Sequence, residues 1–409
     1  MRRQGAALRI TMTTPSILGQ VALGYSPMID RNRAVIATRL TVFPLRPDVK
    51  LDVSQLLEAV GEVWPASGAA ASLNILSEGL LQDLLHAQPA SNLMVEVPSF
   101  IAVDEANVPA LQALHANGSV LLLKGRPSRP LPREVLPCFK HSIIELEDDR
   151  RTAALGSDGI TRTITHVQAG VRTLVELDES FKRGAYAVLG WPMEDVIVHV
   201  TNGKAGAQPD MQVILELINR VDKAEEIDRL ENTLKRDPTL AFKLMRYINS
   251  PAFGLSVEIS SFRHAIMMLG YNRLKRWLAL LLATAGKDVN MKPVMFAAVR
   301  RGLLMEELVR SAGDEEMRNE MFICGVFSLL DRMMRQPFSD LLKTIPVPER
   351  VYQALAEGTG PYQPYFDLVR AIEAESLFDV REAADKLMVG MAEINHAVLH
   401  ALGAANQLE

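Results

Sequence analysis

The sequence predicts a protein of mixed class, with an α/β barrel followed by an all-α domain. Residues 21–200 alternate short β-rich runs with helical stretches, residues 201–210 form a polar segment containing glycine and proline, and amphipathic helices follow. A chain of 409 residues is long for one domain and fits two. We therefore expect a loose N-terminus over 1–20, a barrel domain over 21–200, a linker over 201–210 and a helical domain over 211–405.

The first domain contains apolar runs of strand length, which are typical of a parallel sheet covered by helices on both faces. The helices expected between them include 53–64 and 171–184, and the second ends in a glycine suited to a helix C-cap. This repetition of strand and helix favours an α/β fold, and a barrel is one of its two common closures. The runs are AVIATRLTV (34–42), ASLNIL (71–76), LMVEV (93–97), SVLLL (119–123), SIIEL (142–146), TRTITHV (161–167), AYAVLGW (185–191) and DVIVHV (195–200).

The second domain is predicted from a succession of amphipathic helices. In the helix expected over 237–249, Asp237 suits the N-cap, and Pro238 lies at the first helical position, where its missing N–H costs nothing. The apolar face of that helix consists of Leu240, Leu244, Met245 and Ile248. The other expected helices include 211–221, 224–236, 261–270, 271–286 and 393–405.

Composition restricts the class of function. Apolar residues make up 48% and charged residues 23%, as in folded globular proteins, and a net charge of −5 does not favour a general nucleic-acid binder. Cys138 and Cys324 are too few for a disulfide framework or a cysteine zinc site, which fits a reducing compartment. No signal-peptide pattern, long apolar run, P-loop or dinucleotide fingerprint occurs, so we expect a cytoplasmic location without a membrane or cofactor.

The helical half carries the motifs DPTL, YINSPAFG, ISSFRHAIMMLG and NRLKRW, followed by FICGVFSLLDRM. In this order and spacing they resemble the HDOD domain, a helical output or scaffold module of bacterial signalling proteins that is related to HD-domain hydrolases. The resemblance extends over roughly 208–405 and implies that the His-Asp metal pair of the hydrolases falls on Ser328 and Leu329. A leucine has no lone pair to offer a divalent ion, so we expect no metal there.

The first half contains SPMIDRNRAVIATRLTVF and VQAGVRTLVELDESFKRGAYAVLGWP. These segments resemble the opening strand and a late strand-helix unit of the EAL domain, a TIM-barrel phosphodiesterase of cyclic di-GMP. The chain thus resembles the two-domain EAL–HDOD proteins of bacteria. The EAL-like part covers about 180 residues, fewer than a closed eight-fold barrel usually has, so we expect a trimmed barrel with short or missing helices.

The EAL resemblance also implies which positions would hold two catalytic cations at the carboxyl ends of the strands. Only Asn74 and Glu96 match the metal-binding asparagine and glutamate of the family. The signature glutamate falls on Arg39. The remaining family positions fall on Lys124 and Gly125 (paired aspartates), Glu145 and Glu147 (lysine and aspartate), and Ala169 and Arg172 (late glutamate and its neighbour).

Three bases at these positions oppose metal binding. At about 4 Å and an effective dielectric near 20, a carboxylate attracts a unit charge by roughly 4 kcal/mol, and a base repels it comparably. We therefore predict a non-catalytic signal-transduction protein that acts on other signalling proteins as an interaction, scaffold or sensing module.

Two alternatives stay open. Arg39, Lys124 and Arg172, if they converge, could attract a phosphate or an acidic partner and make the barrel mouth a non-hydrolysing receptor for cyclic di-GMP or another nucleotide. The simpler interpretation is a solvated rim. A basic cluster resembles a nucleic-acid footprint, although a solvated basic face is the simpler interpretation. It comprises Arg263, His264, Arg273, Lys275 and Arg276.

Two weaker candidates complete the search for metal ligands. His396 and His400 lie four apart on an expected helix, but neither a glutamate nor a third ligand accompanies them. Asp331 is a lone acid close to the Ser328 and Leu329 positions. We expect the histidines to be ordinary tail-helix residues and Asp331 to be solvated.

Overall fold

The computed structural model describes residues 16–64, 70–154, 164–195, 209–234, 262–284 and 288–406. The predicted helix over 237–249 and most of the predicted segments 195–200 and 201–210 lie outside these ranges. Within them, no helix is both long enough and apolar enough to cross a membrane.

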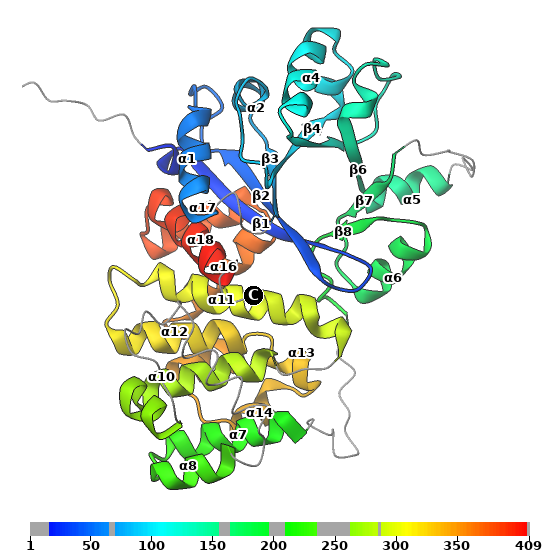
Figure 1. Cartoon of the computed structure of the whole chain (residues 1–409). Helices are drawn as coiled ribbons and strands as arrows, with labels where there is room; N and C mark the ends of the chain where they lie inside the picture. The colour runs from blue at the N-terminus through cyan, green and yellow to red at the C-terminus, as the bar shows by residue number, and fades with distance from the viewer. Residues whose placement is uncertain are drawn as a thin grey trace, which may run out of the picture.

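The N-terminal half is a closed barrel of eight strands in sequential order, which confirms the predicted fold (Figure 1). Strands β2 to β8 pair in parallel, whereas β1 is antiparallel to both β2 and β8. The expectation of a purely parallel sheet is therefore wrong for β1. The strands are β1 (Val21–Ile29), β2 (Val35–Pro44), β3 (Ala70–Ile75), β4 (Leu93–Pro98), β5 (Val120–Lys124), β6 (Phe139–Glu145), β7 (His166–Ala169) and β8 (Ala187–Leu189).

The helices around the barrel are short, as predicted for a trimmed barrel. Between β5 and β6, where every residue is described, the only helix is the 3-10 turn η3 (Leu136–Cys138). Gly184, with φ of +89°, follows the helix α6 as the predicted C-cap glycine. The helices are α1 (Val53–Val63), α2 (Glu78–Leu85), α3 (Ser99–Ala102), α4 (Val108–Ala116), α5 (Leu146–Ala154) and α6 (Leu174–Lys182), with the 3-10 turns η1 (Ile17–Gly19) and η2 (Glu105–Asn107).

Alternate residues of the strands fill the barrel interior in two layers. Near the amino ends of the parallel strands the layer is apolar, and its members include Ala37, Leu122 and Ile143. Two residues further along several strands, the equivalent positions are polar and buried: Arg39, Ser72, Glu96 and, on the antiparallel β1, Ser26. The polar layer therefore lies toward the carboxyl ends of the parallel strands, where barrel enzymes place their active sites.

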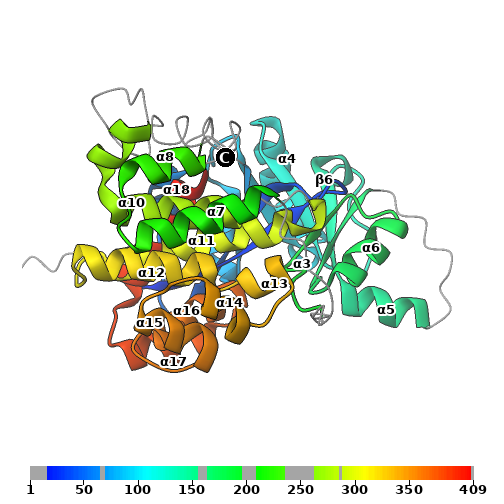
Figure 2. The same cartoon turned by 90° about the horizontal axis from the view of Figure 1, so that it is seen from below.

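The C-terminal half is helical, with several of its helices side by side below the barrel (Figures 1 and 2). Gly270, with φ of +69°, interrupts the long helix α10, so the two helices predicted on either side of it meet at this glycine. The elements are α7 (Pro209–Asp222), α8 (Ile227–Leu234), α10 (Phe262–Thr284), η5 (Val289–Met291), α11 (Lys292–Leu308), α12 (Glu315–Phe327), α13 (Leu330–Met334), α14 (Phe338–Thr344), α15 (Glu349–Tyr352), the π-turn η6 (Gln353–Glu357), α16 (Gln363–Glu373), α17 (Leu377–Leu387) and α18 (Met391–Asn406).

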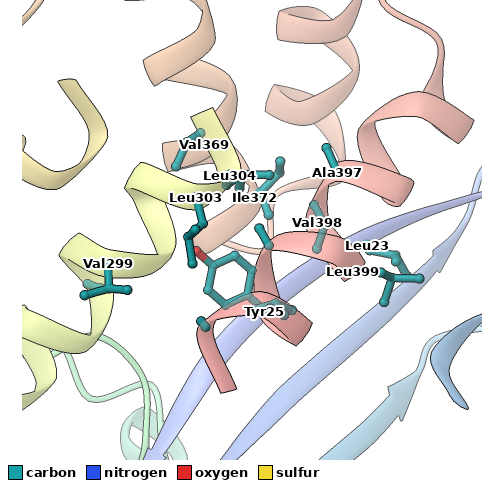
Figure 3. Packing of buried hydrophobic residues seen from close by; sticks show 14 of the residues in the cluster. Leu23, Tyr25, Val299, Leu303, Leu304, Val369, Ile372, Ala397, Val398 and Leu399 are labelled. Carbon is teal, nitrogen blue, oxygen red and sulfur yellow. The ribbon is translucent and has the colours of Figure 1, made fainter. Parts of the chain in front are cut away.

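The last helices return to the barrel and cover the outer face of β1. Helices α16 and α18 contact β1, and α18 also contacts α1. Figure 3 shows Tyr25 of β1 among side chains of the helical half, including Leu303 of α11, Ile372 of α16 and Val398 of α18. Because these residues belong to one apolar cluster, a single core runs through both halves of the chain.

Asn395 fixes this junction by hydrogen bonds to the barrel backbone. Its buried side chain accepts from the N–H of Leu23 at 3.0 Å and donates to the carbonyls of Leu18 and Val21, each at 2.7 Å. The contact also requires a residue without a side chain at Gly24, because an added Cβ would lie 3.0 Å from the carbonyl oxygen of Ile372. The contact between β1 and the last helices is therefore built from matched polar and close-packed groups.

Candidate functional site

The polar layer of the barrel is organised around an ion pair between Arg39 of β2 and Glu96 of β4. Arg39 donates from Nε to Oε1 at 2.9 Å and from Nη2 to Oε2 at 2.7 Å, which is a bidentate geometry. Ser72 of β3 donates a further hydrogen bond to Oε1 of Glu96 at 2.9 Å. Both charged side chains are buried, and Glu96 thus receives three hydrogen bonds, two from Arg39 of β2 and one from Ser72 of β3.

A second chain of hydrogen bonds runs beside the first. Lys124, the last residue of β5, donates from Nζ to Oδ1 of Asn74 at 2.7 Å, and Asn74 donates from Nδ2 to Thr41 at 3.1 Å. Of the three bases whose convergence the sequence left open, Arg39 and Lys124 are therefore close together. Each of them binds one of the two residues that match the family's metal ligands.

A third contribution comes from the helical half. Glu375, in the turn between α16 and α17, accepts a hydrogen bond from Ser26 of β1 at 3.0 Å and lies 3.7 Å from Nη1 of Arg39. Its carboxylate also accepts from the hydroxyl of Thr41. Arg39 is thus placed between two carboxylates, one from the barrel and one from the second domain.

The charges in this layer shift the pKa values of its members in the directions that burial and pairing demand. Burial alone lowers the pKa of Arg39, but the charges of Glu96 and Glu375 outweigh it, and the net pKa is raised. For Lys124, burial and the charge of Arg39 both lower the pKa. Burial raises the pKa of Glu375 against the opposing influence of Arg39 and the two hydroxyl donors.

The other described positions implied by the EAL resemblance contribute no hydrogen bond to this network, although the charge of Glu145 acts on Arg39 and Lys124. Arg172 is 72% exposed and lies 3.8 Å from Glu194, so the structure does not bring it to Arg39. Glu147 is exposed on α5, 3.7 Å from Arg150. The remaining positions are Gly125 (φ of +81°, after β5), Glu145 (exposed, at the end of β6) and Ala169 (buried, at the end of β7).

The two positions that the HDOD resemblance assigns to the His-Asp metal pair, Ser328 and Leu329, make contacts of another kind. Leu329 is buried in the core, and the hydroxyl of Ser328 donates to the carbonyl of Gly325 at 2.7 Å. Arg301 of α11 donates to Ser328 at 3.1 Å and to Glu373 of α16, with Nη2 to Oε2 at 2.7 Å. Burial lowers the pKa of Arg301, but the charge of Glu373 outweighs it, and the net pKa of Arg301 is raised.

No described group of three or more histidine, cysteine or acidic side chains is arranged to hold a metal ion. The rings of His396 and His400 lie 6.4 Å apart between centroids, on α18. Asp331 is partly buried, unlike the solvated residue expected, and burial raises the pKa of its carboxyl group.

The basic cluster around α10 is paired with acids of the same domain. Arg263 contacts Asp228 and Lys275 contacts Asp222. Two further arginines of the cluster pair with acids as well: Arg273 with Glu315 at 3.5 Å, and Arg276 with Glu306, while Arg276 also lies over the ring of Phe322. These pairs give the cluster a local structural role.

Sequence reasoning missed Glu375, Glu373 and Arg301. Glu373 ends α16 and Glu375 lies in the turn after it, far along the chain from the strand residues that they contact, and no local motif marks them. One signal is visible only in the backbone: Glu375 has φ of +53°, a left-handed conformation that favours glycine.

Comparisons with known proteins agree with this architecture. A model of the HDOD domain matches residues 208–336. The uncharacterized protein YuxH of Bacillus subtilis is 29% identical over 179 residues, which are 42% of this chain and 43% of that protein. The cyclic di-GMP phosphodiesterase CdgJ of Vibrio cholerae is 25% identical over 194 residues, 47% of this chain and 45% of that protein. The chain thus spans less than half the length of these two relatives.

Among solved structures, the PaMucR phosphodiesterase in complex with c-di-GMP is 18% identical and covers 43% of this chain and 91% of that chain, with a TM-score of 0.32. The predicted order of domains is confirmed by the fold and the family match together. A closed barrel of eight strands comes first, and the segment that matches the HDOD domain follows it along the chain.

Proposed function

We propose that this chain is a non-catalytic signalling protein in which an EAL-like barrel and an HDOD domain act together as one interaction module. The observation that carries the proposal is the pairing inside the barrel. Glu96 and Asn74, which match the metal ligands of EAL domains, are bound by Arg39 and Lys124. Arg39 and Lys124 occupy positions at which the EAL resemblance implies acidic residues.

This arrangement does not fit a divalent cation. A metal ion at Glu96 would have to replace the guanidinium of Arg39, which would then be buried beside a dication. A buried charge without its partner costs about 3–5 kcal/mol, and like charges at contact distance add repulsion. We therefore infer that this network stabilises the barrel and does not hydrolyse a phosphodiester.

The other half supports the same conclusion. Leu329 and Ser328 occupy the positions of the hydrolase pair, and Arg301 forms a complete ion pair with Glu373 beside them. The proposed activity is accordingly binding and transmission, with other signalling proteins as partners.

The two alternative functions receive less support from the described residues. Arg39 is paired with Glu96, and Lys124 is hydrogen-bonded to Asn74 inside the barrel, which does not favour a nucleotide receptor at this mouth. The cations of the α10 cluster are paired with acids, which does not favour a nucleic-acid surface.

The experiment is a hydrolysis assay with cyclic di-GMP, the substrate in the name of CdgJ. The purified chain is incubated with Mg²⁺ or Mn²⁺ beside an active EAL phosphodiesterase, and the products are separated by chromatography. We expect no product above the level of the metal-free sample. Metal-dependent product that disappears in Glu96→Gln would refute the proposal.

A further inference from the structure

A pocket of about 460 Å³ lies between the barrel and the helical half of the chain, apart from the polar layer of the barrel. Trp191 and Met193, which follow β8, contribute to its wall from the barrel side. Residues of α13, α14, η6 and α16 line it from the other side. Its volume falls within the range of small-molecule sites, which is roughly 300–1,000 Å³.

Two arginines of the pocket form no ion pair within 4.0 Å among the described residues, although the charge of Arg332 acts on its neighbour Asp331. Arg332 donates to the backbone carbonyl of Asp195 at 3.3 Å, and Arg370 lies 5.8 Å from the ring centre of Phe366. Neither forms an ion pair with any carboxylate in the part of the chain that the structure describes, whereas Arg301 beside them is committed to Glu373. The pocket thus offers two guanidinium groups to an anion, and phosphate suits their geometry.

The same pocket contains unused hydrogen-bond acceptors. Oδ1 of Asp331 and Oε1 of Gln363 are buried, and neither has a hydrogen-bond partner among the described residues. Both side chains line the pocket. A buried acceptor left without a donor costs about 1–3 kcal/mol, so a ligand that donates N–H groups here would recover that energy.

Aromatic rings complete the lining. Phe338 of α14 and Phe366 of α16 face the pocket together with Trp191, whose indole N–H is already bonded to the carbonyl of Glu373 at 3.0 Å. Flat apolar surfaces of this kind bind the faces of planar rings. The pocket therefore combines ring surfaces, free acceptors and two arginines.

We propose that this pocket binds a nucleoside phosphate, a function beyond the interaction role described above. The phosphate would contact Arg332 and Arg370, and the base would donate to Asp331 and Gln363. Guanine carries adjacent N–H donors at N1 and N2 that match a carboxylate, whereas adenine presents one amino group, so the pocket favours guanine.

The location of the pocket connects a bound ligand to the barrel interior through the protein chain. Glu373 and Ala374 line the pocket, and the next residue, Glu375, contacts Arg39 in the barrel interior. Occupancy of the pocket would therefore order the turn that holds the two halves together.

The test is calorimetric titration of the full chain with GMP, AMP and inorganic phosphate. We expect GMP to bind, AMP to bind about tenfold more weakly, which is a difference of about 1.4 kcal/mol, and phosphate alone to bind more weakly still. Arg370→Gln should weaken GMP about tenfold, and Asp331→Asn should reduce the preference for GMP over AMP. The matched control is Arg310→Gln, which changes an exposed arginine outside the pocket and should leave the affinity unchanged.

Three results would overturn the proposal. The first is no heat with either nucleotide at about 1 mM. The second is phosphate binding as tightly as GMP, which would show that the base makes no contact. The third is equal GMP affinity in Arg370→Gln and the unaltered chain, with circular dichroism showing that the variant is folded.

Discussion

Arg39 donates two hydrogen bonds to Glu96 in the barrel interior, where both side chains are shielded from water. A carboxylate at this position would complete an EAL metal site, whereas a guanidinium neutralises the remaining acid. The sequence predicts the change of charge at position 39. It does not predict the bidentate geometry, because that depends on the register of β2, β3 and β4 in the closed barrel.

The first prediction concerns this pair. Arg39→Ala leaves Glu96 and Glu375 without their cation, and we expect the free energy of unfolding to fall by about 3 kcal/mol or more. Urea denaturation measures the difference. Arg172→Ala, which removes an exposed pair, should cost less than about 1 kcal/mol. Equal losses in the two variants would contradict the structural role of Arg39.

The second prediction concerns the backbone of Glu375. Glu375 and Met388 both adopt left-handed conformations, with φ of +53° and +54°, but Met388 is 92% exposed and ends α17. Met388→Gly should stabilise the chain slightly, by up to about 1 kcal/mol, because glycine relieves the strain. Glu375→Gly relieves the same strain but loses its contacts with Ser26 and Arg39, so we expect a net loss. Stabilisation by both variants would show that the Glu375 contacts are unimportant.

The third prediction concerns pH. Burial raises the pKa of Asp331 in the folded state, so folding favours its protonated form. The stability of the unaltered chain should therefore fall as the pH rises from the ordinary carboxyl pKa toward the folded-state pKa. Asp331→Asn removes this cost, and its advantage in urea denaturation should be larger at about pH 8 than at about pH 4. An advantage independent of pH would contradict burial of the Asp331 carboxyl group as its cause.

At the scale of the elements, the apolar runs predicted β2 to β6 and β8 within a few residues, because buried parallel strands are continuous in hydrophobicity. The separate antiparallel strand β1 was not predicted. The segment SPMIDRNRAVIATRLTVF resembles one opening strand, but Asp30 accepts from the N–H groups of Asn32 and Ala34, each at 2.8 Å, and makes a turn. Pairing across that turn fixes the direction of β1.

The fourth prediction concerns the contact of α18 with α1. A Cβ at Gly403 would lie 2.7 Å from the carbonyl oxygen of Val63, so Gly403→Ala should destabilise the chain by about 1–3 kcal/mol. Gly61→Ala in α1 meets no atom within 4 Å and should stabilise the helix by about 0.5–1 kcal/mol. Thermal unfolding of the two variants should therefore shift in opposite directions. A neutral Gly403→Ala would mean that α18 does not pack this closely.

At the scale of the whole molecule, the core passes from the barrel into the helical half through Tyr25, Leu303, Ile372 and Val398 (Figure 3). A division near residues 201–210 follows from composition, and the order of barrel and helices follows from motifs. The return of α16 and α18 to β1 could not be predicted from the sequence, because Leu23 and Asn395 are 372 residues apart. Contacts at that separation leave no periodic pattern in a single sequence.

The central claim is that the buried bases exclude divalent cations from the barrel. Titration of Mn²⁺ into the purified chain, followed by electron paramagnetic resonance of the free ion, tests it most directly. We predict that the free-ion signal grows in proportion to the added metal, as in buffer, with no difference between the unaltered chain and Glu96→Gln. Stoichiometric loss of the signal in the unaltered chain, restored by Glu96→Gln, would contradict the account and place a metal at Glu96.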